Sequence, residues 1–216
     1  MSNLNIHSVN WSVYVIIDKE WIRDRSIVSV AESVLRGGAG IIQYRNKTET
    51  DEVFLRDAER LRAVTEKAGV PLIINDRLKA ALAVQADGIH VGPDDLSVSE
   101  VRRSIGNERI LGASLKSLDD WDRMAGADYF GVGAMFPTGT HTGYRAVGPG
   151  LIARLRTRTH RPIVAIGGIR PENLEPVIRA GADGVAVISA VLGSEDPERA
   201  VRSIRSAVER ARIKEK

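Results

Sequence analysis

Eight short apolar segments, separated by amphipathic stretches, constrain the fold of this chain most. They are residues 11–17, 40–45, 71–75, 88–92, 110–115, 128–133, 162–168 and 184–189. Hydrophobic residues recur at helical spacing between them, as in 51–68, 97–105, 148–157 and 170–180. Strands that alternate with helices eight times favour an α/β fold of the closed (β/α)8 TIM-barrel type over an open sheet. We therefore expect a single compact domain over 1–216, with the barrel over about 11–193 and a C-terminal amphipathic helix over about 196–213.

A sequence pattern repeated before alternate apolar segments, called the echo below, supports the barrel. The strings GGAGIIQ, QADGIHVG, GADYFGVG and GADGVAVIS each place a small residue, usually followed by Asp, before a strand. They fall on the second, fourth, sixth and eighth apolar segments. Alternate strands of a barrel contribute side chains to the same interior layers, so a barrel built from repeated units would leave this pattern. An open doubly wound sheet has no reason for it.

Composition narrows the functional classes. The 216 residues include no cysteine, which excludes disulfides, thiolate metal sites and cysteine nucleophiles. The Arg-rich C-terminal tail places Val201, Ile204 and Val208 on one stripe, so we expect an amphipathic surface helix there. The formal net charge of the chain is only +3, and the tail interleaves acids with bases and lacks aromatic residues, so we expect no nucleic-acid partner. No signal peptide or membrane-length apolar run is evident, and we expect a cytoplasmic protein without a membrane partner. A homo-oligomer is left open.

The segment 71–95 reads as a strand, a helix and a second strand, with a carboxylate after each strand. Parallel strands joined by a helix end at the same edge of a sheet, which brings Asp76 and Asp95 to one face. Two oxygen ligands at one cavity suit a Mg²⁺ that keeps several waters and shares itself with substrate phosphates. Alternatively, Asp76 caps the following helix, and Asp94 and Asp95 occupy a turn.

Polar residues gather where the predicted strands end. Gln43, Arg45 and Lys47 alternate at the end of the second strand, so all three would point into the barrel mouth. Arg and Lys suit phosphate oxygens, and Gln suits the edge of a heterocycle. The alternative is a solvated strand end. Other polar residues at strand ends are Asp18, Asn75 and Ser114.

Loops after the sixth, seventh and eighth strands could hold an anion. The first reads FPTGTHTGYRAVG over 136–148 and offers hydroxyls, glycines and cations, although a plain surface loop would read the same way. Gly167 and Gly168 follow the seventh strand, and Ile188 with Ser189 follows the eighth. The loops after strands seven and eight are a frequent phosphate site in this fold.

The chain carries, in order, the strings VYVIID, QYRNK, IINDR, GIHVGPDDL, GASLKS, GADYFGVGAMFPTGT, VAIGGI and GADGVAVISA. From about Ser12 to the tail it thereby resembles the thiamine-phosphate synthase family. The resemblance implies a transferase that joins hydroxymethylpyrimidine diphosphate to the nitrogen of hydroxyethylthiazole phosphate and releases pyrophosphate.

The resemblance also implies roles for individual residues. Arg45, Lys47, Ser114 and His141 would be catalytic, and Asp76 with Asp95 would bind Mg²⁺. The segment 43–47 and Asn75 would hold the pyrimidine diphosphate, and the loops after strands six to eight would hold the thiazole phosphate. The implied substrate-binding residues are Gln43, Tyr44, Arg45, Asn46, Lys47, Asn75, Ser114, Thr138, Gly139, Thr140, His141, Gly168, Ile188 and Ser189.

The chain departs from the family pattern in two important places. The family's Thr-x-Thr-Lys loop, whose lysine lies on the pyrophosphate, has His141 at the lysine position. The family's Ser-x-His after the fifth strand is Ser114-Leu115-Lys116 here. We hypothesise that Lys116 partly replaces the missing cation if its side chain reaches the mouth. Pro93 and Asn46 also differ from the commonest residues, without removing a metal ligand.

Other functions remain open at this point. A related thiazole tautomerase shares the barrel and uses a histidine just before the sixth-strand loop, where this chain has Ala134. A non-catalytic binder of thiamine precursors would explain His141, but both candidate metal carboxylates are retained. The strings QYRNK and FPTGT argue against an unrelated phosphate-binding barrel.

Overall fold

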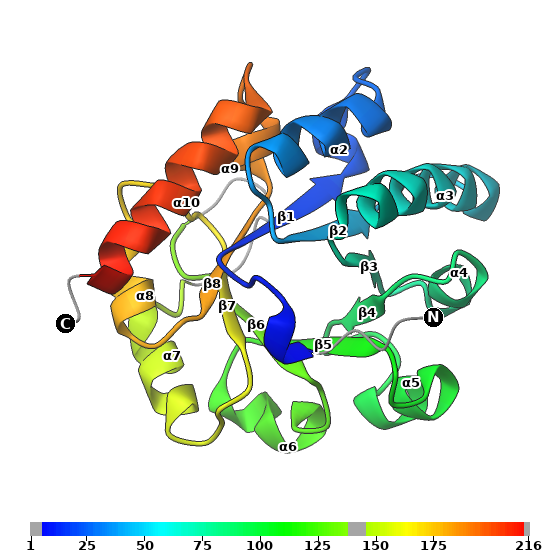
Figure 1. The fold of residues 1–216 in the computed structure, drawn as a ribbon. Helices are drawn as coiled ribbons and strands as arrows, with labels where there is room; N and C mark the ends of the chain where they lie inside the picture. Colours follow the sequence, from blue (N-terminus) through cyan, green and yellow to red (C-terminus); the bar gives the residue numbers. More distant parts are fainter. Residues whose placement is uncertain (1–5, 138–145, 214–216) are drawn as a thin grey trace.

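The computed structural model describes residues 6–137 and 146–213, within which eight parallel strands close into a barrel in chain order (Figure 1). The strands are β1 (Val13–Asp18), β2 (Ile41–Arg45), β3 (Leu72–Asn75), β4 (Gly88–Val91), β5 (Ile110–Leu115), β6 (Tyr129–Gly133), β7 (Ile163–Ile166) and β8 (Gly184–Val187). The predicted (β/α)8 barrel is confirmed, and each strand overlaps the segment predicted for it.

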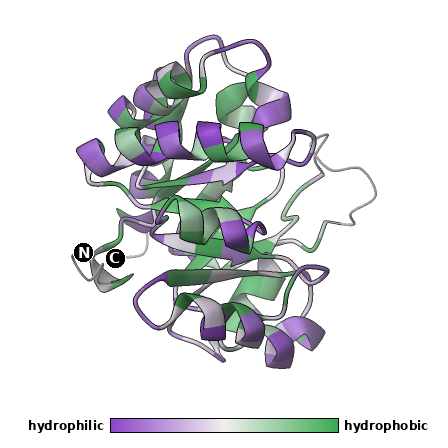
Figure 2. Ribbon diagram, turned by 90° about the vertical axis from the view of Figure 1, so that its right-hand side faces the viewer, coloured by the Kyte–Doolittle hydropathy of each residue, from purple (hydrophilic) through white to green (hydrophobic). Residues whose placement is uncertain are grey.

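Helices surround the barrel, with their polar faces outward and their apolar faces on the strands (Figure 2). They are α1 (Lys19–Ile22), α2 (Ile27–Arg36), α3 (Asp51–Ala68), α4 (Leu78–Ala83), α5 (Val98–Ile105), α6 (Trp121–Met124), α7 (Pro149–Arg156), α8 (Glu175–Arg179), α9 (Ser189–Leu192) and α10 (Pro197–Ile213), with short 3-10 turns η1 (Ile6–Ser8) and η2 (Leu118–Asp120). None of the described helices is both long and apolar enough to cross a membrane.

Local capping explains where the predicted helices begin. Thr50 accepts a hydrogen bond from the Val53 N–H at the start of α3, and Ser97 forms a capping box with Glu100 at the start of α5. The helix predicted over 170–180 is shorter, beginning only at α8. Asn173 is the reason, because its side chain accepts from the Arg170 N–H at 2.8 Å and donates to a carbonyl of the β7 loop, which holds this stretch as a turn.

The echo before alternate strands has a structural cause. Each Asp accepts a hydrogen bond from a backbone N–H at the start of the preceding strand, and also pairs with an Arg from the helix that leads into that preceding strand. The clamps are Asp87 with Leu72 and Arg62, Asp128 with Leu111 and Arg102, and Asp183 with Ile163 and Arg156, all at 2.5–2.8 Å. Gly40 fills this place before β2, where a Cβ would lie 2.0 Å from the Asn10 backbone oxygen.

Helix α10, drawn in red in Figure 1, packs against α2, α8 and α9. Val201, Ile204 and Val208 are buried on the face that the sequence stripe indicated. Near its end, Arg212 donates from Nη1 to the Ser12 hydroxyl at 3.0 Å, which ties the helix to the residue before β1. The last turn of the chain that the structure describes is therefore anchored to the first strand.

Candidate functional site

A cavity of about 330 Å³ opens at the C-terminal ends of the strands, where active sites of this fold lie. Every strand of the barrel contributes to its wall. The lining includes Ile16 from β1, Gln43 and Arg45 from β2, Asn75 from β3, His90 from β4, Ser114 from β5, Gly133 from β6, Ile166 from β7 and Val187 from β8.

The end of β2 gives one wall of the cavity its positive charge. Gln43, Arg45 and Lys47 all line the cavity, as their alternation predicted. The Arg45 guanidinium contacts Asp18, whose carboxylate is almost completely buried at the end of β1 and also accepts from the Glu20 N–H at 3.0 Å. Arg45 therefore enters the cavity with a partner that offsets the cost of its burial.

Asp76 follows β3 in an unusual backbone conformation, and it contacts the cavity-lining Lys47 without lining the cavity itself. Its φ is 51°, in the left-handed region that Asp tolerates better than most residues. Its N–H donates to the His90 carbonyl at 2.9 Å, and its carboxylate accepts from Asn75 at 2.8 Å and contacts Lys47. The alternative that Asp76 caps the next helix is wrong, because Arg77 is the N-cap of α4 and forms no side-chain capping bond.

Asp94 and Asp95 line the cavity from the turn after β4. Both are exposed, and the Asp95 carboxylate accepts from the Gly92 N–H at 2.7 Å. The alternative that these residues form a turn is thus correct for the backbone, and that turn faces the cavity.

A bound Mg²⁺ would find two carboxylates here rather than a complete protein cage. Across residues 6–137 and 146–213, no group of three or more His, Cys, Asp or Glu side chains could hold a metal ion. Asp76 and Asp95 follow neighbouring strands and supply only oxygen; Lys47 contacts Asp76, and Arg45 lines the same cavity as Asp95. This donor set fits Mg²⁺ shared with a substrate diphosphate.

The opposite wall is formed by the ends of β7 and β8. Gly167 and Gly168 line the cavity with φ of 97° and 66°, and a Cβ on either would lie within 2.6 Å of the segment after β6. Glycine is therefore required by both conformation and space. Ile188 and Ser189 line the same wall, with Ser189 opening the short helix α9.

Two sets of predicted residues lie elsewhere. Thr138, Gly139, Thr140 and His141 fall outside the described residues. Tyr44 and Asn46 do not line the cavity: the Tyr44 hydroxyl donates to Asp57 at 3.2 Å and accepts from Asn46 at 3.1 Å. The Asn46 side-chain oxygen Oδ1 accepts from two backbone N–H groups of the loop that carries Lys47, so these two side chains support the site from behind β2.

The floor of the cavity holds three residues that the sequence reasoning did not select, namely Tyr14, His90 and Tyr129. Burial lowers the pKa of His90 to about 4, which leaves its ring neutral at pH 7, and burial raises the pKa of both tyrosines. The sequence did carry a signal for these residues, because each is a polar side chain within an otherwise apolar strand. Such a buried polar group needs a hydrogen-bond partner, which indicates a polar cluster inside the barrel.

Comparison with known proteins identifies the family. A profile described as "Thiamine monophosphate synthase" matches residues 13–191, most of the chain. The chain belongs to the thiamine monophosphate synthase family. The thiamine-phosphate synthase of Chloroflexus aurantiacus is 45% identical over 205 residues, covering 94% of each chain, and that of Alkaliphilus oremlandii is 41% identical over 204 residues, covering 94% of this chain and 98% of the relative.

Solved structures agree with this family. Thiamine phosphate pyrophosphorylase from Pyrococcus furiosus superposes with a TM-score of 0.83 at 34% identity, covering 94% of this chain and 98% of the other. A 3-hexulose-6-phosphate synthase, at 17% identity and a TM-score of 0.66, shares the fold alone. Ser114 and Lys116, the latter at a position where this chain departs from the family pattern, both line the cavity wall at the end of β5.

Proposed function

We propose that this chain is a thiamine-phosphate synthase that transfers the hydroxymethylpyrimidine group from its diphosphate to the nitrogen of hydroxyethylthiazole phosphate. The observation that carries the proposal is the cavity itself. One wall combines Arg45, Lys47 and Asp95, with Asp76 in contact with Lys47, and the other presents glycines and a hydroxyl after β7 and β8. The two walls suit two phosphorylated substrates held face to face.

The cationic wall would bind and orient the diphosphate. Arg45, fixed by Asp18, offers planar donors to phosphate oxygens, and Lys47 offers a point charge. Gln43 and Asn75 would hold the polar edge of the pyrimidine. Asp76 and Asp95 would hold Mg²⁺, which when bound neutralises charge on the diphosphate. Lys47 would then exchange its contact with Asp76 for the substrate.

The reaction needs positioning more than a strong base. The bond between the pyrimidine methylene and the diphosphate oxygen breaks, its electron pair leaves with the diphosphate, and the thiazole nitrogen forms the new bond to the methylene. The electron-rich aminopyrimidine stabilises the developing cation. Fixed donors aimed at the leaving oxygens lower the barrier without moving a proton at the start. Ser114, at the end of β5, would supply such a donor.

The proposed partners are the two small-molecule precursors, and the proposed location is the cytoplasm, whose reducing conditions suit a chain without cysteine. The tautomerase alternative is disfavoured because Ala134 lines the cavity where that relative has a histidine. Retention of both candidate metal carboxylates, Asp76 and Asp95, disfavours the non-catalytic binder.

A coupling assay tests the proposal. Purified protein is mixed with both phosphorylated precursors, with and without Mg²⁺, and thiamine phosphate is followed by chromatography. We expect product only with both precursors and Mg²⁺. If no product forms while calorimetry still detects precursor binding, the chain is a binder or a tautomerase, and the synthase proposal is rejected.

A further inference from the structure

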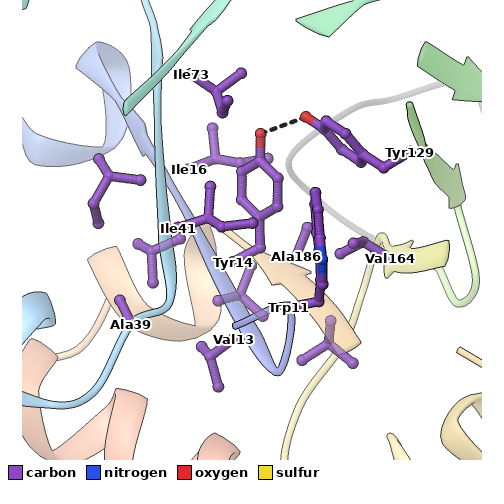
Figure 3. Packing of buried hydrophobic residues seen from close by; sticks show 14 of the residues in the cluster. Trp11, Val13, Tyr14, Ile16, Ala39, Ile41, Ile73, Tyr129, Val164 and Ala186 are labelled. Carbon is purple, nitrogen blue, oxygen red and sulfur yellow. Dashed lines mark hydrogen bonds between the residues drawn. The ribbon is translucent and has the colours of Figure 1, made fainter. Parts of the chain in front are cut away.

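A continuous chain of hydrogen bonds crosses the cavity floor and ends at Ser114. Gln43 Nε2 lies 2.9 Å from the Tyr14 hydroxyl. The Tyr14 hydroxyl lies 2.7 Å from the Tyr129 hydroxyl (Figure 3). His90 continues the chain, with Nδ1 2.9 Å from the Tyr129 hydroxyl and Nε2 2.9 Å from Ser114 Oγ. These residues come from five strands, and the chemistry above assigns no role to Tyr14, Tyr129 or His90.

Glycines in two strands leave space for the Tyr129 and His90 rings, although glycine weakens a strand. A Cβ on Gly112 would lie 2.2 Å from Cζ of Tyr129, and one on Gly131 would lie 3.1 Å from Cε1 of His90. Glycine weakens a strand interior, so its presence marks a close approach by another group. Trp11 also packs against the Tyr129 ring, with ring centroids 4.8 Å apart. The positions of these rings are therefore fixed by packing.

The Gln43 amide fixes the direction of one hydrogen bond, and the proposed relay assigns the directions of the others from it. Gln43 donates to the Tyr14 oxygen, so the buried Tyr14 proton is available for the Tyr129 oxygen. In this assignment Tyr129 donates to Nδ1 of His90. A neutral imidazole that accepts at Nδ1 carries its proton on Nε2, and this proton points at Ser114 Oγ. Ser114 accepts it and keeps its own proton for the cavity.

We propose that this relay holds Ser114 as a hydrogen-bond donor toward the diphosphate leaving group, with His90 and Tyr129 as positioning residues. The reverse polarity would turn the Ser114 proton toward His90 and present a lone pair to an anion, which repels it. The inference rests on the proposed function, because it assigns the leaving group as the acceptor. It goes beyond that function by explaining why a neutral histidine and two tyrosines line the floor.

A double-mutant cycle tests whether His90 acts through Ser114. We expect Ser114→Ala and His90→Asn each to lower kcat by roughly tenfold to a hundredfold, the range for a hydrogen bond to a charged group, with little change in KM. In the Ser114→Ala background, His90→Asn should cost nothing further. Losses that multiply, or an unchanged kcat in His90→Asn, would overturn the proposal.

A conservative pair separates positioning from packing. Glutamine at position 90 extends its amide about as far as Nε2, so His90→Gln should still donate to Ser114 and recover most of kcat, whereas His90→Asn reaches only toward Tyr129. Equal losses in the two variants contradict the relay. Thr65→Val is the matched control, because it removes a buried hydroxyl on α3 that bonds the Arg62 carbonyl outside the cavity, and it should leave kcat unchanged.

Nitrogen NMR of the histidine rings gives a readout independent of turnover. The relay predicts that His90 in the wild-type protein is protonated on Nε2 and unprotonated on Nδ1, and the His90→Gln variant identifies its signals among the four histidines. Protonation on Nδ1 would overturn the relay even if the enzyme is active. An Nε2-protonated ring in a protein that forms no thiamine phosphate would leave the relay intact and reject the synthase.

Discussion

Lys116 illustrates how one residue can carry the difference between this chain and its family. It lines the cavity from the residue after β5, on the same face as Ser114, and is partly buried. Its backbone N–H donates to Asp120 at 2.9 Å, which fixes where the side chain starts. We expect a lysine here to supply positive charge to the leaving group.

We predict that Lys116→Ala lowers kcat/KM for the coupling by about tenfold, the equivalent of one charge-assisted hydrogen bond. His141→Ala should cost less, because an unperturbed imidazole is mostly neutral at pH 7. Steady-state kinetics would measure both variants. Lys79→Ala, on the exposed face of α4, is the charge-matched control and should have no effect. A Lys116→Ala enzyme with the wild-type rate would eliminate the compensation hypothesis.

The burial of His90 should make the stability of the fold depend on pH. The pKa of His90 is lowered to about 4 in the folded protein by burial, against about 6.5 in an unfolded chain, so the unfolded state binds the extra proton between these values. The free energy of unfolding should therefore fall as the pH drops from about 6.5 to 4, by up to roughly 3 kcal/mol from this residue. Denaturant titrations of wild type and His90→Gln across this range would measure it. Parallel pH profiles would show that His90 is not buried neutral.

At the scale of elements, the Asp–Arg clamps divide the barrel into repeated units. Each clamp joins a helix to the starts of two strands, at the end of the barrel opposite the cavity. This arrangement explains why the Asp echo appears in the sequence before alternate strands. The echo was visible without a structure, whereas its Arg partners were hidden among many arginines on helix surfaces.

Loss of a clamp should destabilise the fold without altering the chemistry. Asp87→Asn weakens hydrogen bonds to Arg62 and to the Leu72 N–H, and we expect the free energy of unfolding to fall by about 1–3 kcal/mol. Asp119→Asn, at an exposed position in η2, is the control. Urea denaturation measures the first effect, and kcat below the unfolding transition measures the second. A large fall in kcat with an unchanged free energy of unfolding would contradict the claim that the clamps stabilise the fold without taking part in the chemistry.

For the whole molecule, the sequence predicted the barrel well because periodicity, spacing and the echo all report the same architecture. Alternation also placed Gln43, Arg45 and Lys47 in the mouth. The same alternation turns Tyr44 and Asn46 to the other face of β2, toward α3, and only their place in the motif string led to their prediction as substrate-binding residues. The hydrogen-bond relay on the cavity floor could not be predicted from the sequence, because its members are far apart in the chain and meet only when the barrel closes.

The most direct measurement of the central claim is product formation by wild type and Asp95→Asn over a range of Mg²⁺ concentrations. We predict that the wild type releases thiamine phosphate and pyrophosphate in equal amounts, and that Asp95→Asn needs much more Mg²⁺ to reach half its maximal rate because one rim ligand has lost its charge. No product from the wild type, or identical Mg²⁺ dependence in the two proteins, would contradict the account.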